Sequence, residues 1–129
     1  MNTSEATTRG VKVEVSSRFI REKSDPLSGR WFFAYDIRIS NHGDEVVQLI
    51  NRHWIITDAN GKVEEVRGPG VVGNQPVLAP GESFDYTSFC PLTTPFGTME
   101  GRYQMVVEGG ESFDAEIAQF ALSEPMPVN

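Results

Sequence analysis

The glycines of one short stretch are spaced as in loops that bind phosphate groups. Gly68, Gly70 and Gly73 follow the G-x-G-x-x-G pattern, in which bare backbone N–H groups can approach a pyrophosphate closely. An arginine stands directly before them and supplies a positive charge. The sequence therefore predicts an anion-binding loop. Its candidate ligand-binding residues are Arg67, Gly68, Gly70, Gly73, Asn74 and Gln75.

The residues after these glycines leave a second interpretation open. Pro76 and a short apolar stretch come next, so no helix follows whose N-terminus could hold a phosphate. Glycines also gather wherever the backbone needs dihedral angles that other residues avoid. The loop of residues 68–73 thus either binds an anion through its N–H groups or serves only to shape the chain.

Few residues could carry catalysis or bind a transition metal. Imidazole and thiol groups come only from His42, His53 and Cys90, and they form no recognisable Ser-His-Asp or Cys-His motif. Cys90 is expected to be a small buried or half-buried structural thiol. We expect no catalytic residues, no metal site and no cofactor. An enzyme acting on a phosphorylated nucleotide is a third alternative, which requires His53 and the glycine loop to face a common cleft.

Charge and hydropathy narrow the range of partners. The net charge of −7 opposes binding to nucleic acid, because phosphate backbones are held by clustered Lys and Arg. No apolar run is long enough to cross a membrane, and the N-terminus lacks the pattern of a secretory signal. The single cysteine fits a reducing compartment. We therefore expect a cytoplasmic protein that does not bind nucleic acid and does not insert into membranes.

The candidate residues of the glycine motif must be positioned by β-strands. Apolar side chains recur at every second position in short runs between turns, which is the pattern of strands. The clearest case is residues 31–41, where Phe33, Tyr35 and Ile37 share one face. Asn60 and Gly61 form the residue pair that is typical of a tight hairpin. The predicted strands span residues 11–15, 31–41, 46–58, 62–67, 84–88, 99–107 and 112–122.

Several segments depart from this alternation. Changes of phase near residues 51–53 and within residues 112–122 predict a β-bulge in each of those strands. Polar residues 16–29, the glycine-rich residues 68–76 and the proline-rich residues 90–95 are expected to interrupt the strands. The two ends, residues 1–10 and 123–129, are expected to be flexible.

About seven antiparallel strands in a chain of 129 residues predict one all-β domain, spanning residues 1–129. Hairpin turns between successive strands favour a two-sheet sandwich of the immunoglobulin or fibronectin type III kind. A closed barrel is the second alternative.

An ordered series of short motifs runs from residue 68 to residue 105. It reads GPGVVGNQP, LAPG, FDYTS, PL and GTMEGRYQM, and it is preceded by YDIRISN at residues 35–41 and QLINRHW at residues 48–54. In these motifs the chain resembles the ApaG family. The resemblance covers almost the whole sequence.

The resemblance implies a fibronectin type III-like sandwich. Bacterial members of the family are associated with cobalt and magnesium resistance or efflux, and related eukaryotic domains bind other proteins. The family's glycine motif, which has invited a nucleotide or pyrophosphate hypothesis, falls on Gly68, Gly70 and Gly73. Because nothing in this chain can form a pore, any role in cation efflux would be indirect.

Together these observations favour a non-enzymatic module that binds a protein partner, as a monomer or a homodimer. A binder of a phosphate-containing small ligand, using the glycine loop, is the alternative.

Overall fold

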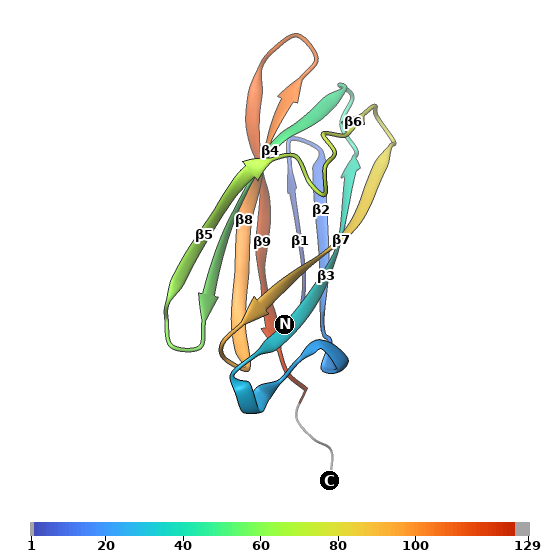
Figure 1. Ribbon diagram of the computed structural model, residues 1–129. Coiled ribbons are helices and arrows are strands. Elements are labelled where there is room, and N and C mark those ends of the chain that lie inside the picture. Colours follow the sequence, from blue (N-terminus) through green and yellow to red (C-terminus); the bar gives the residue numbers. More distant parts are fainter. Residues whose placement is uncertain (1, 126–129) are drawn as a thin grey trace.

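The computed structural model describes residues 2–125, which fold into two antiparallel β-sheets packed face to face (Figure 1). The all-β sandwich is therefore confirmed. Two single-turn 3-10 helices, η1 (Arg21–Lys23) and η2 (Pro26–Ser28), join β2 to β3. The strands are β1 (Thr3–Thr8), β2 (Val11–Phe19), β3 (Trp31–Asn41), β4 (Val47–Asp58), β5 (Val63–Pro69), β6 (Val77–Leu78), β7 (Ser83–Leu92), β8 (Phe96–Val107) and β9 (Ser112–Ser123).

The first sheet has the strand order β1-β2-β3-β7, and the second has the order β5-β4-β8-β9 with β6 paired to β4. Alternating side chains from both sheets meet between them, because successive residues of a strand point to opposite faces. An aromatic cluster fills the middle of this core, with Trp54 in edge contact with Tyr35, Tyr103 and Phe120. Cys90 is buried beside this core, as expected.

Both predicted bulges lie in the second sheet. The register between β4 and β8 shifts between Leu49 and Asn51, so Arg52, Trp54 and Ile56 share a face after the shift. The register between β8 and β9 shifts opposite Glu100. These extra residues reconcile the two phases of the sequence pattern by turning everything after them to the other face.

The two sheets approach each other most closely along one side. There β9 lies against β1 and β2, and Ser4 Oγ and Ser17 Oγ donate hydrogen bonds to the carbonyl oxygens of Ala118 and Ala121 at 2.8 and 2.6 Å. On the opposite side β5 and β7 are edge strands, and no strand pairing joins them among residues 2–125. We call this the open side.

Several strands are longer than the sequence predicted. β2 continues through the expected link to Phe19, because its whole length pairs with β3. β7 continues into the proline-rich segment as far as Leu92, and β5 includes Gly68 and Pro69, which pair with Arg52 and Asn51. In each case tertiary pairing overrides local residue preferences.

The expectation of a flexible N-terminus was wrong. Residues 3–8 form β1, which pairs with β2 over its whole length. Residues 2–125 therefore contain nine strands rather than about seven, the other addition being β6. At the other end β9 reaches Ser123, and residues 126–129 of the expected flexible tail lie outside the described part. No helix among residues 2–125 is long and apolar enough to cross a membrane.

Candidate functional site

The second half of the glycine motif forms a tight turn rather than an open loop of donors. The N–H of Val71 donates to the carbonyl of Asn74, and the N–H of Asn74 donates back to Val71, both at 2.8 Å. Val72 and Gly73 between them have φ values of 42° and 81°, the pattern of a type I′ turn. The side chain of Val71 is buried in the core, so the turn also closes one end of the sandwich.

The polar groups of this segment mostly have partners within the chain. The N–H of Gly70 donates to the carbonyl of Ile50 at 2.8 Å, and the side-chain amide of Gln75 donates to the same carbonyl at 3.0 Å. The side-chain amide of Asn74 donates to the carbonyl of Val72. The N–H groups of Gly70, Val71 and Asn74 are therefore engaged, and this geometry favours the interpretation in which the glycines shape the chain.

A close approach requires glycine at position 70, and a second one makes room for a side chain at position 68. A Cβ added at Gly70, whose φ is 63°, would overlap the carbonyl oxygen of Asn74. At Gly68 a Cβ would lie 2.9 to 3.0 Å from the guanidinium of Arg52. Arg52 Nη1 in turn donates to the carbonyl oxygens of Pro69 and Gly70, both at 2.9 Å. Gly68 thus leaves room for an arginine that lies flat against the backbone.

A cleft of about 470 Å³ lies on the outer face of the second sheet, next to the start of the glycine motif. Its residues are Asn51, Arg52, His53, Arg67, Gly68, Pro69, Arg102, Gln104 and Asp114. Of the six candidate residues the structure places only Arg67 and Gly68 in this cleft. Gly70, Gly73, Asn74 and Gln75 do not line it.

The basic side chains of this cleft contact two carboxylates, those of Glu65 and Asp114. His53 Nε2 lies 2.7 Å from Glu65 Oε1, and Arg67 Nη2 lies 3.2 Å from the same oxygen. The hydrogen bond with His53 and the charge of Arg67 hold the pKa of Glu65 below its ordinary value. Arg102 lies 4.0 Å from Asp114, at the limit of an ion pair. The cleft therefore carries a surplus of positive charge in an acidic chain.

The arrangement bears on the third alternative, an enzyme. His53 and Gly68 do face a common cleft, as that alternative requires, although the rest of the glycine motif does not. No Ser, Thr, Cys or Lys side chain is among the residues that line it. Within residues 2–125 no group of three or more His, Cys, Asp or Glu side chains could hold a metal ion.

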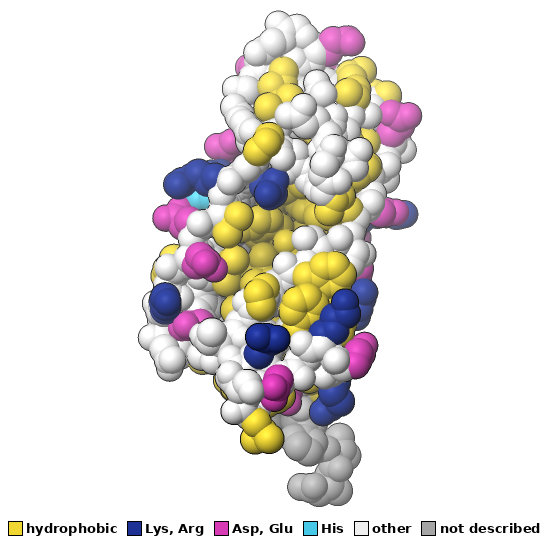
Figure 2. All heavy atoms as spheres, in the orientation of Figure 1, with side chains coloured by type: hydrophobic (Ala, Val, Ile, Leu, Met, Phe, Trp, Pro, Cys, Tyr) yellow, Lys and Arg dark blue, Asp and Glu magenta, His cyan; other side chains and the backbone are white. Residues whose placement is uncertain are grey.

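The open side holds an apolar groove of about 250 Å³ between the two edge strands. Figure 2 shows hydrophobic side chains lining a hollow at the middle of this face. Burial raises the pKa of the Cys90 thiol at its base to about 12. The residues that line the groove are Tyr35, Arg52, Trp54, Ile56, Glu64, Val66, Ser88, Phe89, Cys90, Pro91 and Met99.

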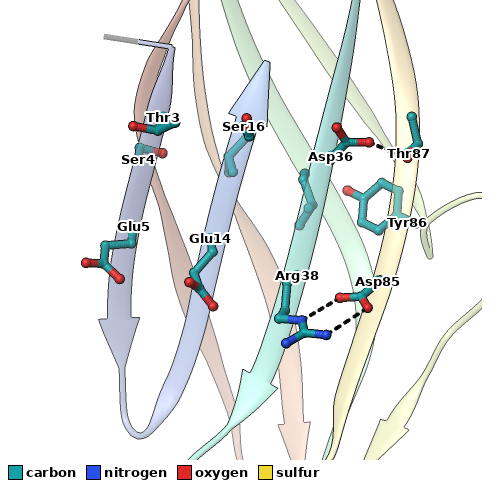
Figure 3. A pocket seen from close by; sticks show the side chains of 12 residues that line it. Thr3, Ser4, Glu5, Glu14, Ser16, Asp36, Arg38, Asp85, Tyr86 and Thr87 are labelled. Carbon is teal, nitrogen blue, oxygen red and sulfur yellow. Dashed lines mark hydrogen bonds and ion pairs between the residues drawn. The ribbon is translucent and has the colours of Figure 1, made fainter. Parts of the chain in front are cut away.

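A third hollow, about 750 Å³, lies on the outer face of the first sheet (Figure 3). Its charged side chains are already paired: Arg38 donates twice to Asp85, at 2.8 and 3.1 Å, and Thr87 Oγ1 donates to Asp36. The ring of Tyr86 lies behind them and packs against the core, where its hydroxyl bonds to that of Tyr103. This surface is a solvated sheet face whose carboxylates pair with neighbouring basic side chains.

Comparison with known proteins identifies the family. The model of the ApaG domain matches residues 21–107. Protein ApaG of Methylorubrum populi is 59% identical over 120 residues, which cover 93% of this chain and 92% of that protein. The chain belongs to the ApaG family. Protein ApaG of an Anaeromyxobacter species is 55% identical and aligns with 98% of this chain and 99% of its own length.

Solved structures agree with this assignment. The crystal structure of a Bordetella pertussis protein described as ApaA is 53% identical, with a TM-score of 0.88, and covers 91% of this chain and 95% of its own. The segment matched by the ApaG model contains both edge strands of the open side and the glycine motif, whereas β1 and β9 lie outside it.

The sequence did not single out Arg52, although it contacts both the groove and the outer cleft. The signal that could have identified it is its phase. After the bulge in β4, Arg52 alternates with Trp54 and Ile56, which both point into the core. An arginine on the inward face of a strand is unusual enough to mark a candidate site.

Proposed function

We propose that this protein is a non-catalytic protein-interaction module that binds an extended partner segment on the open side of its sandwich. It acts in the cytoplasm, and the family's association with cobalt and magnesium resistance or efflux is carried by the partner. The observation that supports this proposal most is the pair of unpaired edge strands flanking an apolar groove. Such edges bind peptides by strand addition, in which main-chain hydrogen bonds give affinity and pockets select side chains.

The strand β7 has the backbone groups that strand addition needs. Pro91 has no N–H, yet it sits within the ladder opposite Phe32. In an antiparallel pair the N–H and C=O of successive residues point to alternate sides, and proline is tolerated where the N–H would point away from the neighbour. Thr87 and Phe89, which share the parity of Pro91, therefore direct their N–H groups to the open side.

The side chains around this edge fit an apolar partner segment. Phe89 is 52% exposed and stacks on Phe32, with ring centroids 5.4 Å apart. Lys23 lies over both rings. On the facing strand Val66 is also exposed. Exposed aromatic and β-branched side chains beside an unpaired edge are the features of a surface that is covered on binding.

Amide hydrogen exchange tests this function directly. The probe is the peptide Ac-Thr-Val-Thr-Val-Thr-NH2, titrated to millimolar concentration into the full chain. The amides of Thr87 and Phe89 should exchange rapidly in the free protein and become protected when the peptide binds. Thr87→Pro should abolish the protection without removing a backbone hydrogen bond to β3, because the backbone donor that it deletes points outward. It also removes the side-chain hydrogen bond from Thr87 Oγ1 to Asp36, so its Tm is measured beside the binding.

The matched control is Thr7→Pro on β1, the edge at the joined side, which should bind the peptide as the native chain does. Saturating peptide that leaves both amides of β7 unprotected would reject strand addition. A dimer in which these amides are already protected would assign the edge to a second copy of the chain and would likewise reject it.

A phosphate-containing small ligand is the second candidate. The surplus of arginine in the outer cleft favours it, and the glycine turn at residues 70–75 is its other possible location. A titration with pyrophosphate, monitored by NMR amide shifts, distinguishes the outer cleft from the glycine turn. Shifts confined to the cleft that are lost in Arg102→Gln and kept in Arg18→Gln would support the cleft. Shifts confined to residues 70–75 would support the turn, and no shifts would reject both.

A further inference from the structure

Arg52 stands at one end of the groove with its charge unpaired. Its side chain is half-buried, and its guanidinium donates hydrogen bonds to the backbone carbonyls of Pro69 and Gly70. Among residues 2–125 no carboxylate lies within ion-pair distance of its guanidinium. A partly desolvated cation bonded only to neutral acceptors gains more from an incoming carboxylate than a fully solvated one does.

Glu64 stands at the other end. On β5 the residues that alternate toward the groove are Glu64, Val66 and Gly68, and they lie opposite Ile56, Trp54 and Arg52 on β4. Glu64 also makes no ion pair among the described residues. The pKa of Cys90 is raised first by burial and second by the negative charge of Glu64. The charge of Glu64 therefore acts on the side chains that line the groove.

The groove is therefore bipolar, with a cation at one end, a carboxylate at the other and apolar side chains between them. Arg52 lies opposite Gly68, which is four residues after Glu64 on β5. At about 3.3 Å per residue this separation is roughly 13 Å. In an extended segment, residues i, i+2 and i+4 point to one face with the same spacing.

We propose that the groove selects an extended partner segment in which an acidic and a basic residue stand four positions apart on either side of an apolar one. The acidic side chain pairs with Arg52, the apolar one lies on Val66 and Trp54, and the basic one pairs with Glu64. This inference rests on the proposed strand addition at β7 and adds the sequence that the groove prefers. The order of the two charges is set by the direction in which the segment runs.

Three capped peptides test the charge preference: Glu-Thr-Val-Thr-Lys, its reverse Lys-Thr-Val-Thr-Glu, and the neutral Gln-Thr-Val-Thr-Gln. Binding is followed by the amide shifts of β7 and β5. One of the two charged peptides should bind about tenfold more tightly than the neutral one, and this advantage should shrink at high salt. Glu64→Gln, an exposed substitution, should remove part of the advantage, whereas Glu108→Gln in a distant turn should not.

A gain of function tests the inference without disturbing the contacts of Arg52. Glu64→Lys makes both ends of the groove basic, so it should favour Glu-Thr-Val-Thr-Glu over both charged peptides. Equal affinity of the native chain for all three original peptides, with the shifts still on β7, would overturn the charge preference and leave strand addition standing. Failure of every peptide to shift β7 would overturn both.

Discussion

At the scale of single residues, Val72 is the most unusual part of the glycine turn. It has a φ of 42°, although its β-branched side chain disfavours the left-handed region. The side chain is 55% exposed and so gains little from packing. Asparagine or glycine would adopt this conformation more easily, because type I′ turns prefer Asn-Gly.

We expect Val72→Asn to raise the free energy of unfolding by about 1 kcal/mol, since it relieves this backbone strain. Urea unfolding followed by tryptophan fluorescence measures the change. Val63→Asn is the matched control, because Val63 is equally exposed at 55% but lies in a strand. It should be neutral or destabilising. A Val72→Asn variant no more stable than the native chain would show that the turn is unstrained.

The candidate residues were only partly predictable from the sequence. The motif drew attention to Arg67 and Gly68, which do line the cationic cleft. It could not show that the N–H groups of Gly70 and Asn74 would be engaged, because their acceptors are set by tertiary geometry. Arg52 could not be recognised from hydropathy, because an arginine between two polar residues, Asn51 and His53, is expected on the solvent face of a strand.

At the scale of elements, β1 shows what alternation cannot detect. Its sequence, TSEATT, offers no apolar side, so its order depends on bonds to other strands. It pairs with β2, Ser4 donates to the carbonyl of Ala118, and Thr8 Oγ1 accepts from the N–H of Glu116. The two bulges, by contrast, were predictable because a change of phase is visible in the sequence itself.

Removal of residues 1–8 should destabilise the domain by several kcal/mol, because it deletes a complete strand pairing and exposes β2 as a new edge. Thermal unfolding and size-exclusion chromatography should show a lower Tm and some self-association. The single change Ser4→Ala removes one hydrogen bond between the sheets and should cost about 1 kcal/mol. A truncated chain with native Tm would mean that β1 contributes nothing to stability.

At the scale of the whole molecule, the sandwich and the family could be predicted because the core alternation and the ApaG motifs extend over most of the chain. The closure of one side and the opening of the other could not, since both depend on how the sheets pack. This asymmetry places the groove, the arginine at its end and the glycine motif on one side of the molecule.

The pH dependence of stability should follow the paired surface carboxylates. A hydrogen bond with His53 and the charge of Arg67 hold the pKa of Glu65 below its ordinary 4.5, and a hydrogen bond with Arg38 holds that of Asp85 below 3.8. A carboxylate with a lowered pKa in the folded state stabilises the fold above its unfolded pKa and loses that contribution as pH falls through the folded pKa. Tm should therefore drop below about pH 4.5.

The double variant Glu65→Gln, Asp85→Asn should show a shallower drop, and Glu108→Gln serves as the control on an exposed turn. Differential scanning calorimetry between pH 3 and pH 7 provides the measurement. Identical pH profiles for the native chain and the double variant would mean that these pairs are too well screened to matter.

Pro91 has one more consequence, which concerns polymerisation. A free edge that accepts one foreign strand can in principle template the next copy of its own chain and grow into a fibre. Here Pro91 ends the row of outward donors after Phe89, so an added strand finds no donor at the Leu92 end of β7. Each further copy would also add seven negative charges to the stack. The edge can thus stay open at high protein concentration while the chain remains unpolymerised.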